Sequence, residues 1–288
     1  MKKYLIYILI ILGQSLFSQE SSLIFNKFNL SVFNPAYVGV DGSAINLNTR
    51  VQWLGIEDGP MTNYLIIHLP EKKNASLGFT VQNDRVFVEN KSQVTLDYSY
   101  KLKLSNSSYL SLGLKAGGRF FNIDINNVPR IFSEANQSIS EPGSYFSPIL
   151  GAGVSYISKK GFLGVAVPGL LNSMALNTNQ EWELTSRDYT YLHVSGGIYL
   201  NLSDKFSVNP SLIYRSNPRQ PDLFNSVIEV DYNDRFSLGS IYTNNNTMAF
   251  FFKLKSKKGF HIGYGYEFST ASDMEAIKNS THELMLRI

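Results

Sequence analysis

The chain reads Phe260-His261-Ile262-Gly263-Tyr264-Gly265-Tyr266-Glu267-Phe268 near its end, and this stretch decides the fold. Every second residue is apolar or aromatic, and His, Gly, Gly and Glu stand between them. Successive side chains of a β-strand point to opposite faces, so one face is apolar and the other is polar or glycine. The same period of two recurs over residues 45–53, 94–102 and 110–116. The alternation predicts an all-β protein.

Segments with this pattern follow one another along the whole chain. We expect about fourteen strands, near residues 44–53, 61–69, 75–83, 91–103, 108–121, 146–157, 160–168, 188–201, 204–215, 221–232, 235–243, 246–254, 259–268 and 280–288. Most have roughly the 9–11 residues with which a tilted strand crosses a bilayer. Gaps after even-numbered strands are short, and several gaps after odd-numbered strands are long, as in bacterial outer-membrane barrels. A soluble β-sandwich also alternates but does not predict this asymmetry. The pattern therefore favours an antiparallel up-and-down β-barrel of the outer membrane over residues 44–288.

The composition agrees with a barrel that faces lipid. Aromatic residues make up 13% of the chain and charged residues only 17%, whereas soluble domains carry about 25% charged residues. The chain has no Cys, which excludes disulfides, thiolate metal sites, cysteine nucleophiles and a cysteine-linked lipid anchor. A formal net charge of +3 gives no reason to expect nucleic-acid binding.

The N-terminus predicts export. Lys2 and Lys3 precede the apolar run Tyr4 to Leu12, and small and polar residues follow up to Ser18. This run is much shorter than the roughly 20 residues of a membrane-spanning helix. The order is that of a cleavable secretory signal. We therefore expect a signal peptide over residues 1–18, an N-terminal periplasmic segment over residues 19–43, and a barrel in the outer membrane.

The polar face of the strands is expected to line a hydrated lumen. Its charged and histidine residues are Arg50, Asp97, Lys101, Lys115, Arg119, His193, His261, Glu267, Glu283 and Arg287. We expect Asp97 to pair with Lys101 and Glu283 to pair with Arg287.

The sequence offers no convincing catalytic or cofactor site. His193 and Ser195 share a face, but a nucleophile also needs a base that a third group orients. The four histidines lack metal-ligand spacing, and the glycines near residue 117 fit no nucleotide-binding motif. We expect no catalysis, no cofactor, no metal and no small-molecule substrate.

Asn34-Pro35-Ala36-Tyr37-Val38-Gly39 precedes the first expected strand and resembles the NPAYAG element of the PorP/SprF family. These are membrane proteins of the type IX secretion system of Bacteroidetes. Further similar elements follow in a consistent order at residues 50–53, 167–172, 192–199, 209–214, 220–223, 262–267 and 282–287. The likeness runs from about residue 22 to the end, with Val38 where the family usually has Ala and Glu267 where it often has Asp.

The resemblance implies a role in secretion or surface attachment of cargo proteins that carry a type IX C-terminal domain, including gliding-motility adhesins in some relatives. The partners would be the cargo, other type IX components and outer-membrane lipid. A polar lumen with both charge signs leaves an alternative open, namely a passive porin or a transporter of hydrophobic solutes.

Two elements are candidates for binding a partner. Pro35 restrains the backbone of Asn34, and Gly39 permits a sharp bend, so the segment with Ala36 and Tyr37 could plug the lumen, dock a partner or form only a turn. Trp182 and Leu184 lie in a long expected loop, either as exposed anchors for a partner or within a self-packed cover of the pore.

Overall fold

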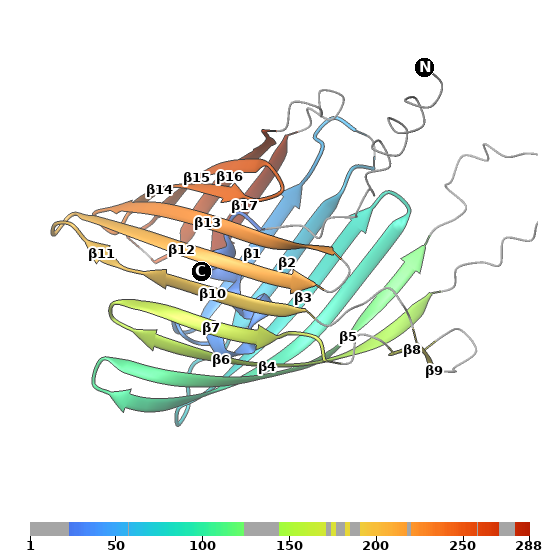
Figure 1. Ribbon diagram of the computed structural model, residues 1–288, viewed down its shortest axis with the longest axis horizontal. Coiled ribbons are helices and arrows are strands. Elements are labelled where there is room, and N and C mark those ends of the chain that lie inside the picture. Colours follow the sequence, from blue (N-terminus) through green and yellow to red (C-terminus); the bar gives the residue numbers. More distant parts are fainter. Residues whose placement is uncertain are drawn as a thin grey trace, which may run out of the picture.

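The computed structural model describes residues 23–56, 58–123, 144–170, 174–176, 182–184, 191–217, 220–257, 259–270 and 280–288. Its strands form one antiparallel sheet that closes on itself, because β1 (Ala44–Val51) pairs with both β2 (Met61–His68) and β17 (Thr281–Arg287). The sheet continues through β3 (Ala75–Val86), β4 (Glu89–Ser105), β5 (Ser108–Ile123), β6 (Tyr145–Ser158) and β7 (Gly161–Val167). After β7 it includes β10 (Leu192–Ile198), β12 (Phe206–Asn217), β13 (Gln220–Tyr232), β14 (Phe236–Thr243), β15 (Thr247–Lys255) and β16 (His261–Ser269). Figure 1 shows this continuous wall.

Three further short strands lie beside the wall. The two residues of β11 (Leu200–Asn201) continue β10 alongside β12, and the pair β8 (Met174–Leu176) and β9 (Trp182–Leu184) lies beside β6. Among the described residues, the closed ring thus has fourteen strands. The expected all-β, up-and-down barrel of about fourteen strands is confirmed.

The strand ends differ from expectation by a few residues. The first strand was expected to reach Trp53 but ends at Val51. Trp53 has a φ of 56°, which is the left-handed region and does not continue a strand. By contrast, β4 and β5 are longer than expected, with 17 and 16 residues.

Burial along the strands is inverted relative to a soluble protein. Leu96 and Leu114 on the outer face are each 62% exposed, whereas Asp97 on the inner face is 1% exposed and Glu283 is fully buried. A soluble protein buries leucine and exposes carboxylates. Apolar side chains outside and polar side chains inside are the arrangement of a membrane β-barrel.

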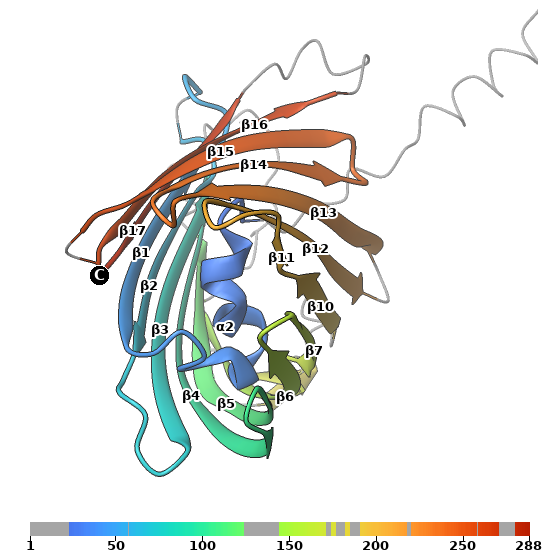
Figure 2. The same ribbon diagram turned by 90° about the vertical axis from the view of Figure 1, so that its left-hand side faces the viewer.

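The N-terminal segment lies inside the barrel. It consists of three short helices, η1 (Asn26–Asn29), α2 (Leu30–Phe33) and η2 (Pro35–Tyr37), which Figure 2 shows surrounded by the wall. We call residues 23–42 the plug. In the part of the chain that the structure describes, no helix has the length and apolarity to cross a membrane.

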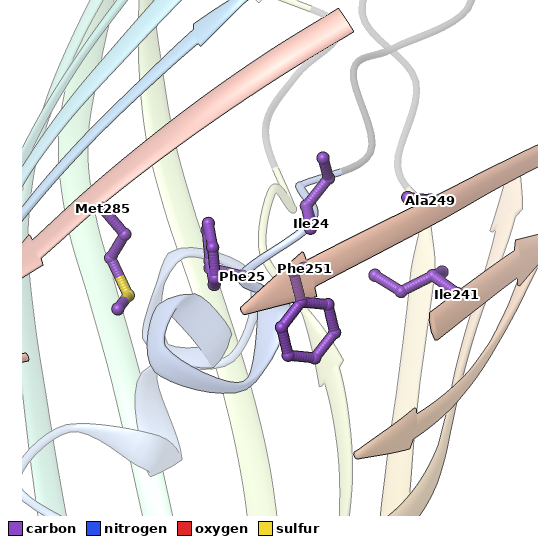
Figure 3. Packing of buried hydrophobic residues seen from close by; sticks show 6 residues of the cluster. All are labelled: Ile24, Phe25, Ile241, Ala249, Phe251 and Met285. Atoms are coloured by element: carbon purple, nitrogen blue, oxygen red, sulfur yellow. The ribbon is translucent and has the colours of Figure 1, made fainter. Parts of the chain in front are cut away.

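Apolar packing is concentrated between the plug and the wall. The largest cluster joins Ile24 and Phe25 of the plug to Ile241, Ala249, Phe251 and Met285 of the wall (Figure 3). Phe25 and Phe251 meet edge to face, with ring centroids 5.6 Å apart. Two smaller clusters join Leu23, Val32 and Phe33 to β2, and Leu30 and Tyr37 to β6 and β12. The hydrophobic core of this protein therefore depends on the plug.

Candidate functional site: the plug and its seat

The Asn34-Pro35-Ala36-Tyr37 turn has a defined local structure. Asn34 is extended, with φ −135°, and its side-chain Oδ1 accepts a hydrogen bond of 2.9 Å from the backbone N–H of Ala36. Asn is a preferred N-cap residue, and Pro at the next position is already constrained to a helical φ. The motif therefore begins the short helix η2 and fixes which way its side chains point.

The wall receives this turn on inward-facing glycines. A Cβ on Gly113 of β5 would lie 2.1 Å from the backbone N of Ala36. A Cβ on Gly153 of β6 would lie 2.1 Å from Asn34 Oδ1, and a Cβ on Gly164 of β7 would lie 2.3 Å from the Tyr37 hydroxyl. We call these three glycines the seat. Their lack of side chains is what lets the plug approach the wall this closely.

Hydrogen bonds hold the turn on the seat. Asn34 Nδ2 donates to the carbonyl oxygens of Val154 at 3.2 Å and Val165 at 3.5 Å. Ser155 Oγ donates to the Ala36 carbonyl at 3.3 Å, and the hydroxyls of Tyr37 and Ser195 are 3.0 Å apart. Burial raises the pKa of Tyr37 above its ordinary value, so this hydroxyl keeps its proton.

A buried carboxylate holds the start of the plug. Glu283 of β17 accepts the backbone N–H groups of Ile24 at 2.7 Å and Phe25 at 3.1 Å, and it accepts Asn48 Nδ2 at 2.9 Å. The guanidinium of Arg50 lies 3.4 Å from this carboxylate and 2.6 Å from that of Glu267. Removing one partner of such a buried pair costs about 3–5 kcal/mol, so Arg50 holds the Glu283 carboxylate where it accepts the two N–H groups of the plug.

The expected pairing of Asp97 with Lys101 is wrong. Asp97 instead lies 2.6 Å from Lys115 on the neighbouring strand, with both side chains 1% exposed. Lys115 also donates to the carbonyl of Ser31 in the plug at 3.3 Å. Residues four apart in a strand are separated by about 13 Å, whereas directly opposed residues on adjacent strands are about 5 Å apart. Lys101 pairs with Glu71 near the short turn between β2 and β3.

The expected pairing of Glu283 with Arg287 is wrong for the same reason. Arg287 Nη1 lies 3.3 Å from Asp41 Oδ2 at the end of the plug. Both charges thus contact the plug, one near its first residue and one near its last.

The residues expected to line the lumen stand at inward positions of their strands, which are Arg50, Asp97, Lys101, Lys115, Arg119, His193, His261, Glu267, Glu283 and Arg287. Arg119 donates to Gln93 at 2.9 Å, and the ring of His261 lies 5.6 Å from that of Phe28. The structure brings eight of them onto plug residues or onto each other. Arg50, Glu267 and Glu283 lie together, Asp97 pairs with Lys115, and Arg287 pairs with Asp41. The rings of His193 and His261 lie against Phe33 and Phe28 of the plug.

His193 and Ser195 share a face but do not act on each other. The ring of His193 stacks on Phe33 with centroids 5.0 Å apart, and Ser195 bonds to Tyr37. Within the described ranges, no three His, Cys, Asp or Glu side chains come together as metal ligands. Residues 1–18 lie outside the described residues, as do the side chains of Trp182 and Leu184, whose backbone forms β9.

Sequence reasoning missed the seat, although its signal was present. The seat glycines and Gly263 and Gly265 all occupy inward positions, and each faces a plug residue. Glycine at alternate strand positions marks the inward face, but the alternation does not indicate what each glycine faces. Sequence reasoning also missed the pairing of Lys253 with Glu229. The carboxylate of Glu229 lies 3.9 Å from Lys27 Nζ of the plug.

The family of type IX secretion system membrane proteins PorP/SprF matches residues 18–288, nearly the whole chain. The chain belongs to the PorP/SprF family. The expected membership is therefore confirmed, and the plug contains the family's NPAY element, residues 34–37. A comparison with curated proteins finds no match to this PorP/SprF sequence.

Several solved barrels share the fold of this PorP/SprF protein. A TodX mutant described as a monoaromatic hydrocarbon channel aligns with a TM-score of 0.54 and 9% identity, over 90% of this chain and 93% of that one. The Ralstonia pickettii toluene transporter TbuX aligns with a TM-score of 0.51 and 11% identity, over 88% and 91%. The CymD monoaromatic hydrocarbon channel aligns with a TM-score of 0.50 and 12% identity, over 91% and 92%. At these identities the likeness establishes the barrel fold alone.

Proposed function

We propose that this protein is an outer-membrane accessory of type IX secretion that assists the export or surface attachment of a cargo protein with a type IX C-terminal domain. The family match over residues 18–288 is the observation that carries this proposal. The barrel acts through binding, without catalysis, cofactor or metal. Its partners are the cargo, other components of the secretion system and the surrounding lipid.

We infer the orientation from the connections between strands. At the end that holds the start of β1 and the end of β17, the connections between successive antiparallel strands have two to six residues. The long connections from β5 to β6, from β7 to β10 and from β16 to β17 all lie at the opposite end. Short turns face the periplasm in bacterial barrels. We therefore assign this end, with Asp41 and the linker into β1, to the periplasm, which would let periplasmic components reach the end of the plug. Residues 1–18 are removed as a signal peptide.

The occupied lumen favours a scaffold over an open pore. The plug contacts wall strands from β1 round to β17 and is fixed at its start by Glu283 and at its turn by the seat. A passive porin needs a continuous water-filled path, and this segment stands in it.

A passive channel for small or hydrophobic solutes is the second candidate. Beside the plug, two small cavities of ≈ 20 and ≈ 40 Å³, enough for about one to three water molecules, share Lys27, Phe28, Leu30 and Phe162 in their linings. A solute path along this side of the plug would use them. The hydrocarbon channels with the same fold are consistent with this candidate.

Deletion of the gene in its native host tests the secretion role. We expect particular proteins with type IX C-terminal domains to be lost from the surface and medium and to accumulate inside the cell, with recovery upon complementation. Affinity purification of the tagged barrel from detergent-solubilised membranes should recover the same cargo. An unchanged set of surface and secreted proteins would refute the role. Steady open conductance of the purified barrel in planar bilayers, together with that unchanged set, would support the channel instead.

A further inference from the structure

We propose that the lumen is a peptide-binding site for a segment with an Asn-Pro-small-aromatic turn, and that the plug is its resident ligand, which such a peptide can replace in trans. This goes beyond the secretion role and does not depend on it. The ligand class is a peptide of about twenty residues that supplies two free backbone N–H groups near its start and the Asn-Pro turn near its end, as residues 23–42 do.

The plug is attached to the barrel as a tethered ligand would be. None of its residues pairs with a strand of the wall. Its last residues, just before β1, include Gly39 with φ 71° and Gly42 with φ 86°. A Cβ on Gly39 would lie 2.3 Å from Ser76 Oγ of β3, whereas a Cβ on Gly42 would meet nothing within 4 Å, so the backbone has open space beside it only at Gly42. Glycine at such positions allows the backbone to change direction with little steric resistance.

The wall recognises the main chain of the plug through its own side chains. Glu283 accepts the N–H groups of Ile24 and Phe25, and Asn46 Nδ2 donates to the carbonyl of Phe28 at 2.9 Å. Lys115 and Ser155 donate to two further plug carbonyls. Bonds from fixed side chains to a backbone are the contacts with which a receptor binds a peptide of defined shape.

Specificity comes from the turn. Among the described residues, Asn34 and Tyr37 are the plug side chains that bond to the wall across the seat, and the seat accepts a backbone only because its three residues lack a Cβ. A small residue is needed at position 36, since this residue lies against Gly113. The site therefore selects Asn, then Pro, then a small residue and an aromatic residue with a hydroxyl.

The interface has the polarity of an exchangeable one. Asn26 Nδ2, both amide atoms of Asn29, and the Oδ1 atoms of Asn46 and Asn48 are buried, yet they make no hydrogen bond to any described residue. Buried polar atoms without partners favour the undocked state, in which water satisfies them. The wall itself is a hydrogen-bonded ring, so its strands stay paired when the plug leaves, while the inner apolar residues that the plug covers become exposed to water.

An exchange experiment on the full mature chain tests the proposal. The tethered plug has an effective concentration in the millimolar range, so it must be weakened without changing the wall. Asn34→Ala does this, because it removes two bonds to the wall and the cap of η2. At equal concentration of a fluorescent synthetic peptide of residues 23–42, we expect the variant in detergent to bind about tenfold more peptide than the wild-type barrel. A peptide with the sequence scrambled should bind to neither.

A reversible lock provides the control. A Cβ on Gly265 would lie 3.2 Å from the Cβ of Ile24, close to the spacing of about 3.8 Å in disulfides, and the chain has no other Cys. Adding Ile24→Cys and Gly265→Cys to the Asn34→Ala variant should abolish peptide uptake when oxidised and restore it upon reduction. The peptide used with this variant carries Ile24→Gly, because a side chain at position 265 would otherwise overlap Ile24. A disulfide within the wall, from Thr49→Cys and Asn63→Cys at directly paired positions, should leave uptake unchanged.

Each variant is checked for folding by the heat-dependent gel shift of a closed barrel, and Tyr37→Phe replaces Asn34→Ala if the latter does not fold. Equal uptake by the variant and the wild-type chain, equal uptake of the scrambled peptide, or uptake by the oxidised lock would each overturn the proposal.

Discussion

Gly113→Ala is the sharpest test that the seat holds the plug in place. The added methyl group would lie 2.1 Å from the backbone N of Ala36 and 2.4 Å from the carbonyl carbon of Pro35. The wall cannot give way, because Gly113 is paired with Ser99 on one side and Gly153 on the other. The plug must therefore move away from the wall.

The magnitude follows from the bonds that this movement breaks. Asn34 to Val154, Ser155 to Ala36 and Tyr37 to Ser195 would all lengthen beyond hydrogen-bond distance. The loss of these three bonds costs about 1 kcal/mol each, and the remaining steric overlap costs about 1 kcal/mol more. Together they weaken docking by roughly 4 kcal/mol. The population of undocked plug should then rise on the order of a thousandfold.

Single-channel recording in planar bilayers measures this population as the fraction of time that the barrel conducts. Gly113→Ala should conduct far more often than the wild-type chain. Gly196→Ala is the matched control, because the nearest atom to its added methyl is Leu163 Cδ1 at 3.3 Å, and it should behave like wild type. If Gly113→Ala stays as closed as Gly196→Ala while both retain the heat-dependent gel shift, the plug is not held by the seat.

Three further outcomes are expected. Asp97→Asn should lower the temperature of the gel shift, because it leaves the buried Lys115 unpaired at a cost of about 3–5 kcal/mol; an unchanged temperature would contradict the buried pair. Leu114→Arg should impair folding into lipid vesicles by about 2–4 kcal/mol, whereas Leu54→Arg, which is similarly exposed but lies between strands, should fold normally; equal folding would refute the lipid-facing assignment. Glu283→Ala should make the plug susceptible to trypsin in an otherwise resistant barrel, as mass spectrometry would show, and continued protection would mean that the carboxylate does not hold it.

The strands of the barrel could be predicted because their signal is local. The alternation of apolar and polar residues determines which face meets lipid, and the tight turns determine how neighbouring strands pair. The residues at which strands begin and end were predicted less accurately. Trp53 continues the apolar alternation of the first strand, yet its backbone has already turned into the left-handed region. A side-chain pattern carries no information about such a backbone change.

The contacts inside the barrel could not be predicted, because they join residues far apart in the sequence. Glu283 binds Ile24 and Phe25 across more than 250 residues, and nothing local to either segment indicates this. The two expected ion pairs are wrong because they rest on spacing within one strand, whereas the register between adjacent strands determines which charged side chains meet. The NPAY element is recognisable in the sequence through its resemblance to a family, but only the barrel geometry places it against Gly113 and Gly153.

The bond between Glu283 and the first turn of the plug also sets an order of events during assembly. The plug is synthesised before the strands of the wall, whereas its anchoring carboxylate belongs to β17, which is synthesised after the other strands. Ile24 and Phe25 therefore lack the acceptor of their N–H groups until β17 has paired with β1. A docked plug therefore distinguishes a closed barrel from an incomplete one, and an assembly factor that binds newly inserted barrels has this difference to recognise.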